Sequence, residues 1–246
     1  MFEEFIPKRK IGVLSPLAVI DNAAYEFYRI APPGAMMVMA PVGLQKFTAE
    51  DVERVFEPID EKVDMLMERG VDIVMQSGVP LPILIGVDAH DRLLAHIEKR
   101  AGVAVTSSVL GVAAAARHLG IKNLALANKW TEEMNATLGE FFAREGVSIA
   151  GVASRVMGPD KFQKMSSAAS IDLAYEVGRR ALEDYPEADG LYIGGGAWLS
   201  HPVAQRLEEE SGKPVYCNKS AMIWDTLHRV DYWTPIEGHG RLLAGD

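Results

Sequence analysis

Three consecutive glycines, Gly194, Gly195 and Gly196, follow a short apolar run and precede a segment with helical spacing. Glycines at such a position leave backbone N–H groups unobstructed at the start of a helix, where they can bind a carboxylate, a phosphate or a developing oxyanion. The competing interpretation is that the glycines only allow a tight turn. We favour an anion site because a matching loop occurs earlier in the chain.

That matching loop consists of Ser77, Gly78, Val79 and Pro80. Val79 can donate its N–H, whereas Pro80 has none, so this loop offers fewer donors and a more apolar surface. Ser77 is a candidate nucleophile or proton relay. No His or Asp lies near it in the sequence to activate it, so the competing interpretation is a serine that caps the following turn.

Two further apolar runs end in residues that could contact a ligand. Asn128 and Trp130 precede a helix start at Thr131, and Trp130 could donate its indole N–H to a carboxylate, stack on a ring, or serve only as a hydrophobic anchor. Asn218 and Lys219 stand at another helix start. Lys219 could pair with a carboxylate or, once desolvated, act as an acid or base, although lysines at such positions are usually solvated.

The histidines and the single cysteine indicate no metal site. The six histidines are scattered, and His90 and His96 lack the i, i+4 spacing of a helical metal pair. His201 is a candidate general acid or base, with an ordinary surface histidine as the alternative. Cys217 is the only cysteine, which excludes an internal disulfide, and we interpret it as buried and structural rather than reactive.

Short apolar runs that end in Gly, Pro, Ser or Asn alternate with segments of helical spacing along the chain. This alternation predicts an α/β fold with mostly parallel sheets flanked by helices. The clearest helix begins after Thr48, a candidate N-cap, and should kink or split at Pro58 before it ends at Gly70. Strands are expected at 11–14, 36–39, 73–75, 103–105, 124–127, 147–152, 191–193 and 215–217.

The chain also resembles itself at about half its length. The run 70–78 parallels 188–196, and 101–107 parallels 211–217. This offset indicates an ancient duplication into two pseudo-symmetric halves. We expect an N-terminal half at 1–112 and a C-terminal half at 113–246, with the C-terminal segment able to pack back on the first half. Because ligands bind beyond the carboxyl ends of parallel strands, the two glycine-containing loops should face each other across a cleft.

Composition argues against several classes of partner. The net charge is −9 and no basic run exceeds 8–10, so neither nucleic acid nor an anionic membrane finds a complementary surface. The first ten residues are polar and charged, unlike a signal peptide, and no apolar stretch approaches the roughly 20 residues that span a bilayer. We therefore expect a cytoplasmic protein.

The order and spacing of several segments resemble the arylmalonate decarboxylase and maleate isomerase family, within the aspartate/glutamate racemase superfamily. The resemblance implies the same two-half fold, no cofactor, no metal, and small carboxylic acids as substrates. It adds Pro16 to the substrate-binding candidates and leaves a homo-oligomer open. The matching segments are Ile11 to Pro16, Phe47 to Glu50, Ser77 to Leu81, Leu126 to Trp130, Gly190 to Leu199, Ile223 to Asp225 and Gly238 to Leu242.

The same resemblance exposes departures from the family pattern. The family carries a catalytic cysteine in one or both facing loops, and the matching positions here are Gly78 and Gly195. A two-thiol racemase mechanism and the thiol addition of an isomerase therefore do not carry over. Trp130 matches a tyrosine that hydrogen-bonds a carboxylate, Asn218 matches an asparagine frequent in isomerases, and Pro80 replaces a serine of the decarboxylases.

These observations favour a cofactor-independent lyase, most simply a decarboxylase of a small carboxylic or dicarboxylic acid. Its carbanion or enolate would be held by the N–H groups of Val79, Gly195 and Gly196. An isomerase or hydrolase on the same scaffold and a non-catalytic carboxylate-binding protein are the alternatives. The candidate proton donors are Ser77, Lys219, His201 and a bound water.

Overall fold

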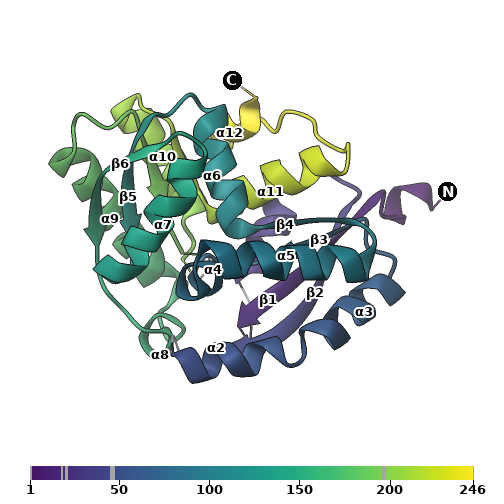
Figure 1. Cartoon of the computed structure of the whole chain (residues 1–246). Coiled ribbons are helices and arrows are strands. Elements are labelled where there is room, and N and C mark those ends of the chain that lie inside the picture. The colour runs from purple at the N-terminus through teal and green to yellow at the C-terminus, as the bar shows by residue number, and fades with distance from the viewer. Residues whose placement is uncertain (1, 18, 20–21, 45–47, 196–197, 246) are drawn as a thin grey trace.

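The computed structural model describes residues 2–17, 19, 22–44, 48–195 and 198–245 of the 246-residue chain. It contains two four-stranded parallel sheets, one in each half of the sequence, with helices packed around them (Figure 1). The first sheet has the order β2-β1-β3-β4 and the second has the equivalent order β6-β5-β7-β8. The two-half α/β fold expected from the sequence is confirmed, because both sheets repeat one topology.

Each strand expected from the sequence is present. Most are longer than the apolar run that predicts them, because pairing continues into the polar residues at the strand ends. The strands are β1 Arg9–Leu17, β2 Ala35–Leu44, β3 Ile73–Gln76, β4 Ala104–Ser107, β5 Asn123–Asn128, β6 Ser148–Ser154, β7 Gly190–Ile193 and β8 Val215–Cys217.

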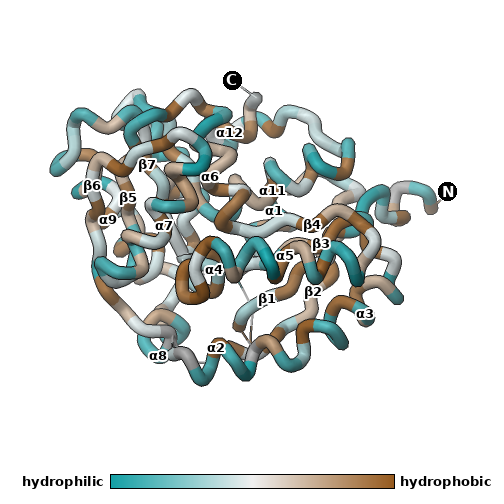
Figure 2. The backbone as a smooth tube through the Cα atoms, in the orientation of Figure 1, coloured by the Kyte–Doolittle hydropathy of each residue, from teal (hydrophilic) through white to brown (hydrophobic). Residues whose placement is uncertain are grey.

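The helices follow the capping and breaking residues of the sequence. Thr48 accepts a hydrogen bond from Asp51 N at 3.3 Å and begins α2, and the break expected at Pro58 separates α2 from α3. Hydrophilic and hydrophobic residues alternate along both helices (Figure 2). The helices are α1 Asn22–Ile30, α2 Ala49–Phe56, α3 Ile59–Glu68, α4 Pro80–Ile85, α5 Val87–Ala101, α6 Ser108–His118, α7 Glu132–Arg144, α8 Pro159–Phe162, α9 Ser167–Asp184, α10 His201–Ser211, α11 Asn218–Arg229 and α12 Arg241–Ala244, after a 3-10 turn at Glu3–Phe5.

The two halves exchange the helices that follow their last strands. α6 follows β4 in the chain, yet its Val112 packs in one cluster with Leu126 and Tyr216 of the second half. α11 follows β8, and its Ile223 packs with Val13 of β1 in the first half. The two helices also pack against each other, and the boundary expected near residue 112 falls inside α6. The exchange buries apolar surface between the halves and fixes how their strand ends face each other.

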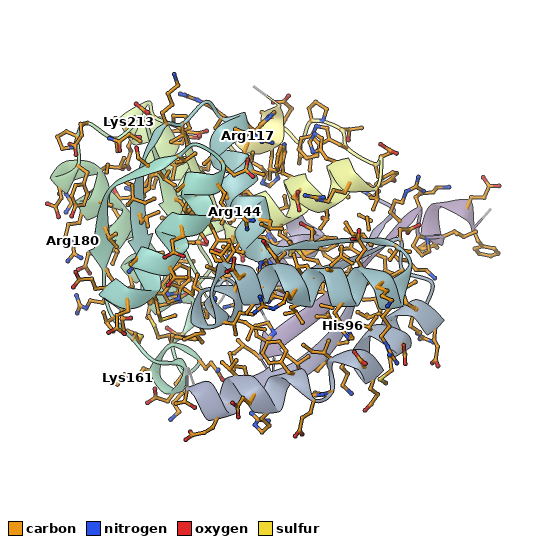
Figure 3. All side chains as sticks on the ribbon, viewed as in Figure 1. His96, Arg117, Arg144, Lys161, Arg180 and Lys213 are labelled. Atoms are coloured by element: carbon orange, nitrogen blue, oxygen red, sulfur yellow. The ribbon has the colours of Figure 1, made fainter. Side chains whose placement is uncertain are left out.

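No helix in the described part of the chain is both long enough and apolar enough to cross a membrane. Charged side chains such as Lys161, Arg180 and Lys213 lie at the edge of the molecule (Figure 3). Two lysines, Lys129 and Lys219, depart from this pattern because they are almost completely buried.

Candidate active site

A cavity of about 170 Å³ lies at the carboxyl ends of the parallel strands and is lined by both halves. Pro16 in β1 and Ser77 after β3 come from the first half, and Lys129 after β5 and Gly195 after β7 come from the second. This is where an α/β fold of parallel strands places its ligand site. The wall is completed by Ser15, Leu17, Val19, Asn22, Ala23, Leu44, Gly78, Pro80, Ser108, Trp130, Phe162, Gln163, Met165, Asn218, Lys219 and Met222.

The cavity gathers most of the residues that the sequence singled out. The two facing loops meet at it through Gly78 and Gly195, as the duplication predicted. Val79, Asn128, Gly194 and His201 are buried but do not line it. Gly196 lies outside the described residues. The sequence candidates that do line the cavity are Pro16, Ser77, Gly78, Pro80, Trp130, Gly195, Asn218 and Lys219.

One glycine N–H in each of the two loops is already engaged by a side chain of the protein. Gly195 N donates to Asn218 Oδ1 at 3.2 Å, and Gly78 N donates to Ser108 Oγ at 3.0 Å. Asn218 Oδ1 also accepts a hydrogen bond from the hydroxyl of Tyr192. The expectation that Gly195 N–H is free to hold an oxyanion therefore does not fit this structure, because a long-range side-chain contact satisfies it.

A side chain at either loop glycine would crowd a neighbouring residue. Gly78 has φ +85°, and a Cβ there would lie 2.7 Å from Pro16 Cγ. Gly195 has φ +127°, and a Cβ there would lie 3.0 Å from Lys129 Nζ. Both φ values lie in the region that favours glycine. The absence of the family thiols is thus built into the backbone and packing of both loops.

Lys129 is a functional candidate that the sequence reasoning missed. Its Nζ lies 4.3 Å from the ring centre of Trp198 and 4.6 Å from that of Phe162. The nitrogen is buried and has no hydrogen-bond partner among the described residues. Burial among these groups lowers the pKa of Lys129 well below its ordinary value. Its position between a buried strand and a capped helix was the available signal, but nothing local distinguishes it from a solvated lysine.

Lys219 is buried beside a carboxyl group that the sequence gave no reason to select. Burial lowers the pKa of Lys219, and the nearby charge of Glu26 in α1 acts in the opposite direction. Burial raises the pKa of Glu26 to about 7, and the charge of Lys219 and a hydrogen bond from His201 N at 3.3 Å lower it in part. Lys219 lines the cavity and Glu26 does not, so one ionisable group with a shifted pKa faces the cavity and a second lies near it.

The other candidates have mainly structural contacts. His201 Nε2 lies 2.6 Å from His239 Nδ1, and burial lowers the pKa of His201 to about 4. The side chain of Asn128 bonds Asn135 and accepts from Trp130 N, which fixes the loop that carries Lys129.

Ser77 and Cys217 are the remaining residues that the sequence suggested for a chemical role. Ser77 does not cap α4, because Val79 is the N-cap of that helix and no side chain caps it. Cys217 is fully buried, and burial raises its pKa, which disfavours a reactive thiolate. Within the described residues, no three His, Cys, Asp or Glu side chains gather closely enough to hold a metal ion.

The arrangement of halves, loops and cavity matches a known family. The family model for arylmalonate decarboxylase matches residues 25–243. The chain belongs to the arylmalonate decarboxylase family. Arylmalonate decarboxylase of Bordetella bronchiseptica is 25% identical over 213 residues, which cover 86% of this chain and 87% of that protein.

Solved structures show the same fold in this family and in maleate isomerases. A liganded double mutant of arylmalonate decarboxylase superposes with a TM-score of 0.85 at 23% identity, covering 97% of this chain and all of that one. A cysteine-to-serine mutant of Nocardia farcinica maleate cis-trans isomerase, which carries a covalently bound succinylcysteine intermediate, has a TM-score of 0.82 at 18% identity and covers 97% of this chain and 99% of that one. The maleate isomerase of Pseudomonas putida S16 with maleate bound also has a TM-score of 0.82, at 15% identity, with 96% of this chain and 98% of that one covered.

Proposed function

We propose that this member of the arylmalonate decarboxylase family is a cofactor-independent decarboxylase of small carboxylic acids, in which Lys129 replaces the missing thiol. The observation that carries the proposal is the position of Lys129 Nζ, 3.0 Å from where a side chain at Gly195 would begin. An acid–base group thus reaches the place from which a residue 195 side chain would act.

Lys219 suits the binding of a substrate carboxylate. It lines the cavity, and although burial lowers the pKa of Lys219, the charge of Glu26 acts against this and favours the ammonium form. Leu17, Pro80 and Met222 also line the cavity, and apolar side chains such as these solvate a carboxylate poorly. Such surroundings favour loss of the charged group as neutral carbon dioxide.

Lys129 suits the protonation step. A substrate carboxylate near Nζ brings a negative charge into its surroundings, which favours the ammonium form once the substrate is bound. The carbon–carbon bond to the departing carboxylate then breaks, and its electron pair remains on the α-carbon. The ammonium donates one proton to that carbon and returns to the amine, which regains a proton from solvent. One proton is consumed for each carbon dioxide released.

Proton NMR in deuterated buffer tests this proposal with a pool of methylmalonate, phenylmalonate and maleate. We expect a decarboxylated product that carries one deuterium. The rate of Lys129→Met should be lower than that of the wild type by a factor of about 100 or more. Lys164→Met is the matched control, because Lys164 is exposed and does not line the cavity.

Other outcomes of the same experiment would replace the proposal. Conversion of maleate to fumarate without loss of carbon dioxide would indicate an isomerase. Thermal stabilisation by these acids without any conversion would indicate a carboxylate-binding protein. An unchanged rate in Lys129→Met would remove Lys129 from the mechanism.

A further inference from the structure

The two lysines of the cavity have different surroundings. Lys219 has the charge of Glu26 nearby, whereas Lys129 Nζ lies over the aromatic rings of Trp198 and Phe162. A cation over an aromatic face gains some stabilisation, but this is smaller than the penalty for burying an unpaired ammonium. Lys219 is therefore suited to hold an anion, and Lys129 to present a neutral amine with a free electron pair.

A neutral amine is a nucleophile toward carbonyl groups. Desolvation in an apolar pocket is one of the ways in which proteins activate lysine for imine formation. A small acid that carries both a carbonyl and a carboxylate would meet both lysines, with the carbonyl at Lys129 and the carboxylate at Lys219. The cavity, of about 170 Å³, can hold a small acid of this kind.

We propose that Lys129 forms an imine with short 3-oxo carboxylic acids and that the cavity decarboxylates them through this covalent intermediate. The inference rests on the proposed function only in using the same cavity for loss of carbon dioxide. It adds a second activity and a second substrate class, since malonates have no ketone with which an amine can condense.

Each step balances. The Lys129 amine adds to the ketone carbon, and loss of one water with uptake of one proton leaves a protonated imine. The bond between the carboxylate and the α-carbon breaks, carbon dioxide leaves, and the electron pair moves toward the imine nitrogen to form an enamine. Protonation of the enamine carbon restores the protonated imine, and water hydrolyses it to the ketone, the free amine and one proton. The net reaction consumes one 3-oxo acid and one proton.

Phe162 covers part of Lys129 Nζ. The nitrogen is buried, and the ring of Phe162, at the end of the short helix α8, lies 4.6 Å from it and also lines the cavity. Removing this ring exposes more of Nζ to a ketone in the cavity. Phe162→Ala should therefore increase the rate of adduct formation. If the ring only contributed to packing, its removal would not increase this rate.

In the experiment, the intact wild-type chain is reduced with sodium borohydride in the presence of acetoacetate. The protein is then digested, and its peptides are analysed by mass spectrometry. We expect one major adduct, an isopropyl group on Lys129, because decarboxylation before reduction leaves the acetone imine. Lys129→Met should lower the total adduct at least about tenfold, and Lys164→Met should not change it. Methylmalonate in place of acetoacetate should leave no adduct.

The outcomes separate this inference from the proposed function. Adducts spread over exposed lysines, or acetoacetate decarboxylation without an adduct on Lys129 in the wild type, would overturn the imine. Turnover of methylmalonate with no acetoacetate adduct would support the proposed function and reject this inference. The Lys129 isopropyl adduct without methylmalonate turnover would do the opposite. Mapping the adduct in the wild type keeps the test decisive even if Lys129→Met folds poorly.

Discussion

Lys129 Nζ lies 3.0 Å from the position that a Cβ atom would occupy on Gly195. Ala127 of β5 lies opposite Ile193 of β7 in the sheet. Lys129 follows Ala127 by two residues, and Gly195 follows Ile193 by two residues. Adjacent parallel strands thus deliver a lysine and a glycine to the same point of the cavity. The lysine fills space that exists only because residue 195 has no side chain.

This relationship predicts a coupling between the two positions. Gly195→Cys should destabilise the fold by about 1–3 kcal/mol, since the new Cβ meets Lys129 and the backbone keeps φ +127°. In a Lys129→Ala background the same substitution should be less costly by about 1 kcal/mol, because only the backbone strain remains. Urea unfolding of the four proteins measures the difference. Equal costs in both backgrounds would show that the two side chains do not compete for space.

The Glu26 carboxyl should make stability depend on pH. The pKa of Glu26 is raised from 4.5 to about 7, so between these values the folded protein holds a proton that the unfolded chain has released. The contribution of protonated Glu26 to the free energy of unfolding is fully present below pH 4.5 and is lost as the pH rises through 7. The free energy of unfolding of Glu26→Gln minus that of wild type should therefore increase over this window, by roughly 3 kcal/mol at most.

Chemical denaturation at several pH values between 4 and 8 measures this difference. Glu53→Gln is the control, since Glu53 is an exposed glutamate. A Glu26→Gln difference that stays flat across the window would mean that the carboxyl titrates normally in the folded protein.

The Gly78 loop should reject even a methyl group. A Cβ at Gly78 would lie 2.7 Å from Pro16 Cγ, in addition to the strain of φ +85°. Gly86 has a similar φ of +81° but nothing within 4 Å of its Cβ position, so Gly86→Ala measures backbone strain without the clash. We expect Gly78→Ala to lower stability by about 1–3 kcal/mol more than Gly86→Ala. If thermal unfolding shows equal losses, Pro16 moves aside without penalty.

Asn218 should be needed for its acceptor oxygen. Oδ1 accepts from Gly195 N and from the Tyr192 hydroxyl, and both donors are buried. Asn218→Ala leaves these donors unpaired and should destabilise the protein by about 2–4 kcal/mol. Asn218→Asp keeps the oxygen and should retain more of the stability. Similar losses in the two variants, measured by urea unfolding, would contradict a role for the acceptor.

Local patterns in the sequence determined the elements of the fold. Apolar periodicity, the Thr48 cap and the Pro58 break are effects of neighbouring residues, so they predict strands and helices without knowledge of the rest of the chain. The internal repeat predicted two halves, and strand direction predicted that Gly78 and Gly195 face one cavity. The segments that resemble the family led to the family that the comparisons show.

Tertiary structure alone decided the chemistry of the site, because burial and charge depend on segments far apart in the chain. Lys129 is desolvated by Phe162 and Trp198, which come from other elements, and Glu26 reaches the neighbourhood of Lys219 from α1. The packing of α11 against α1 of the first half brings Lys219 near Glu26. From the sequence alone, a lysine is expected to be solvent-exposed. Only the packing in the tertiary structure shows which lysine is desolvated.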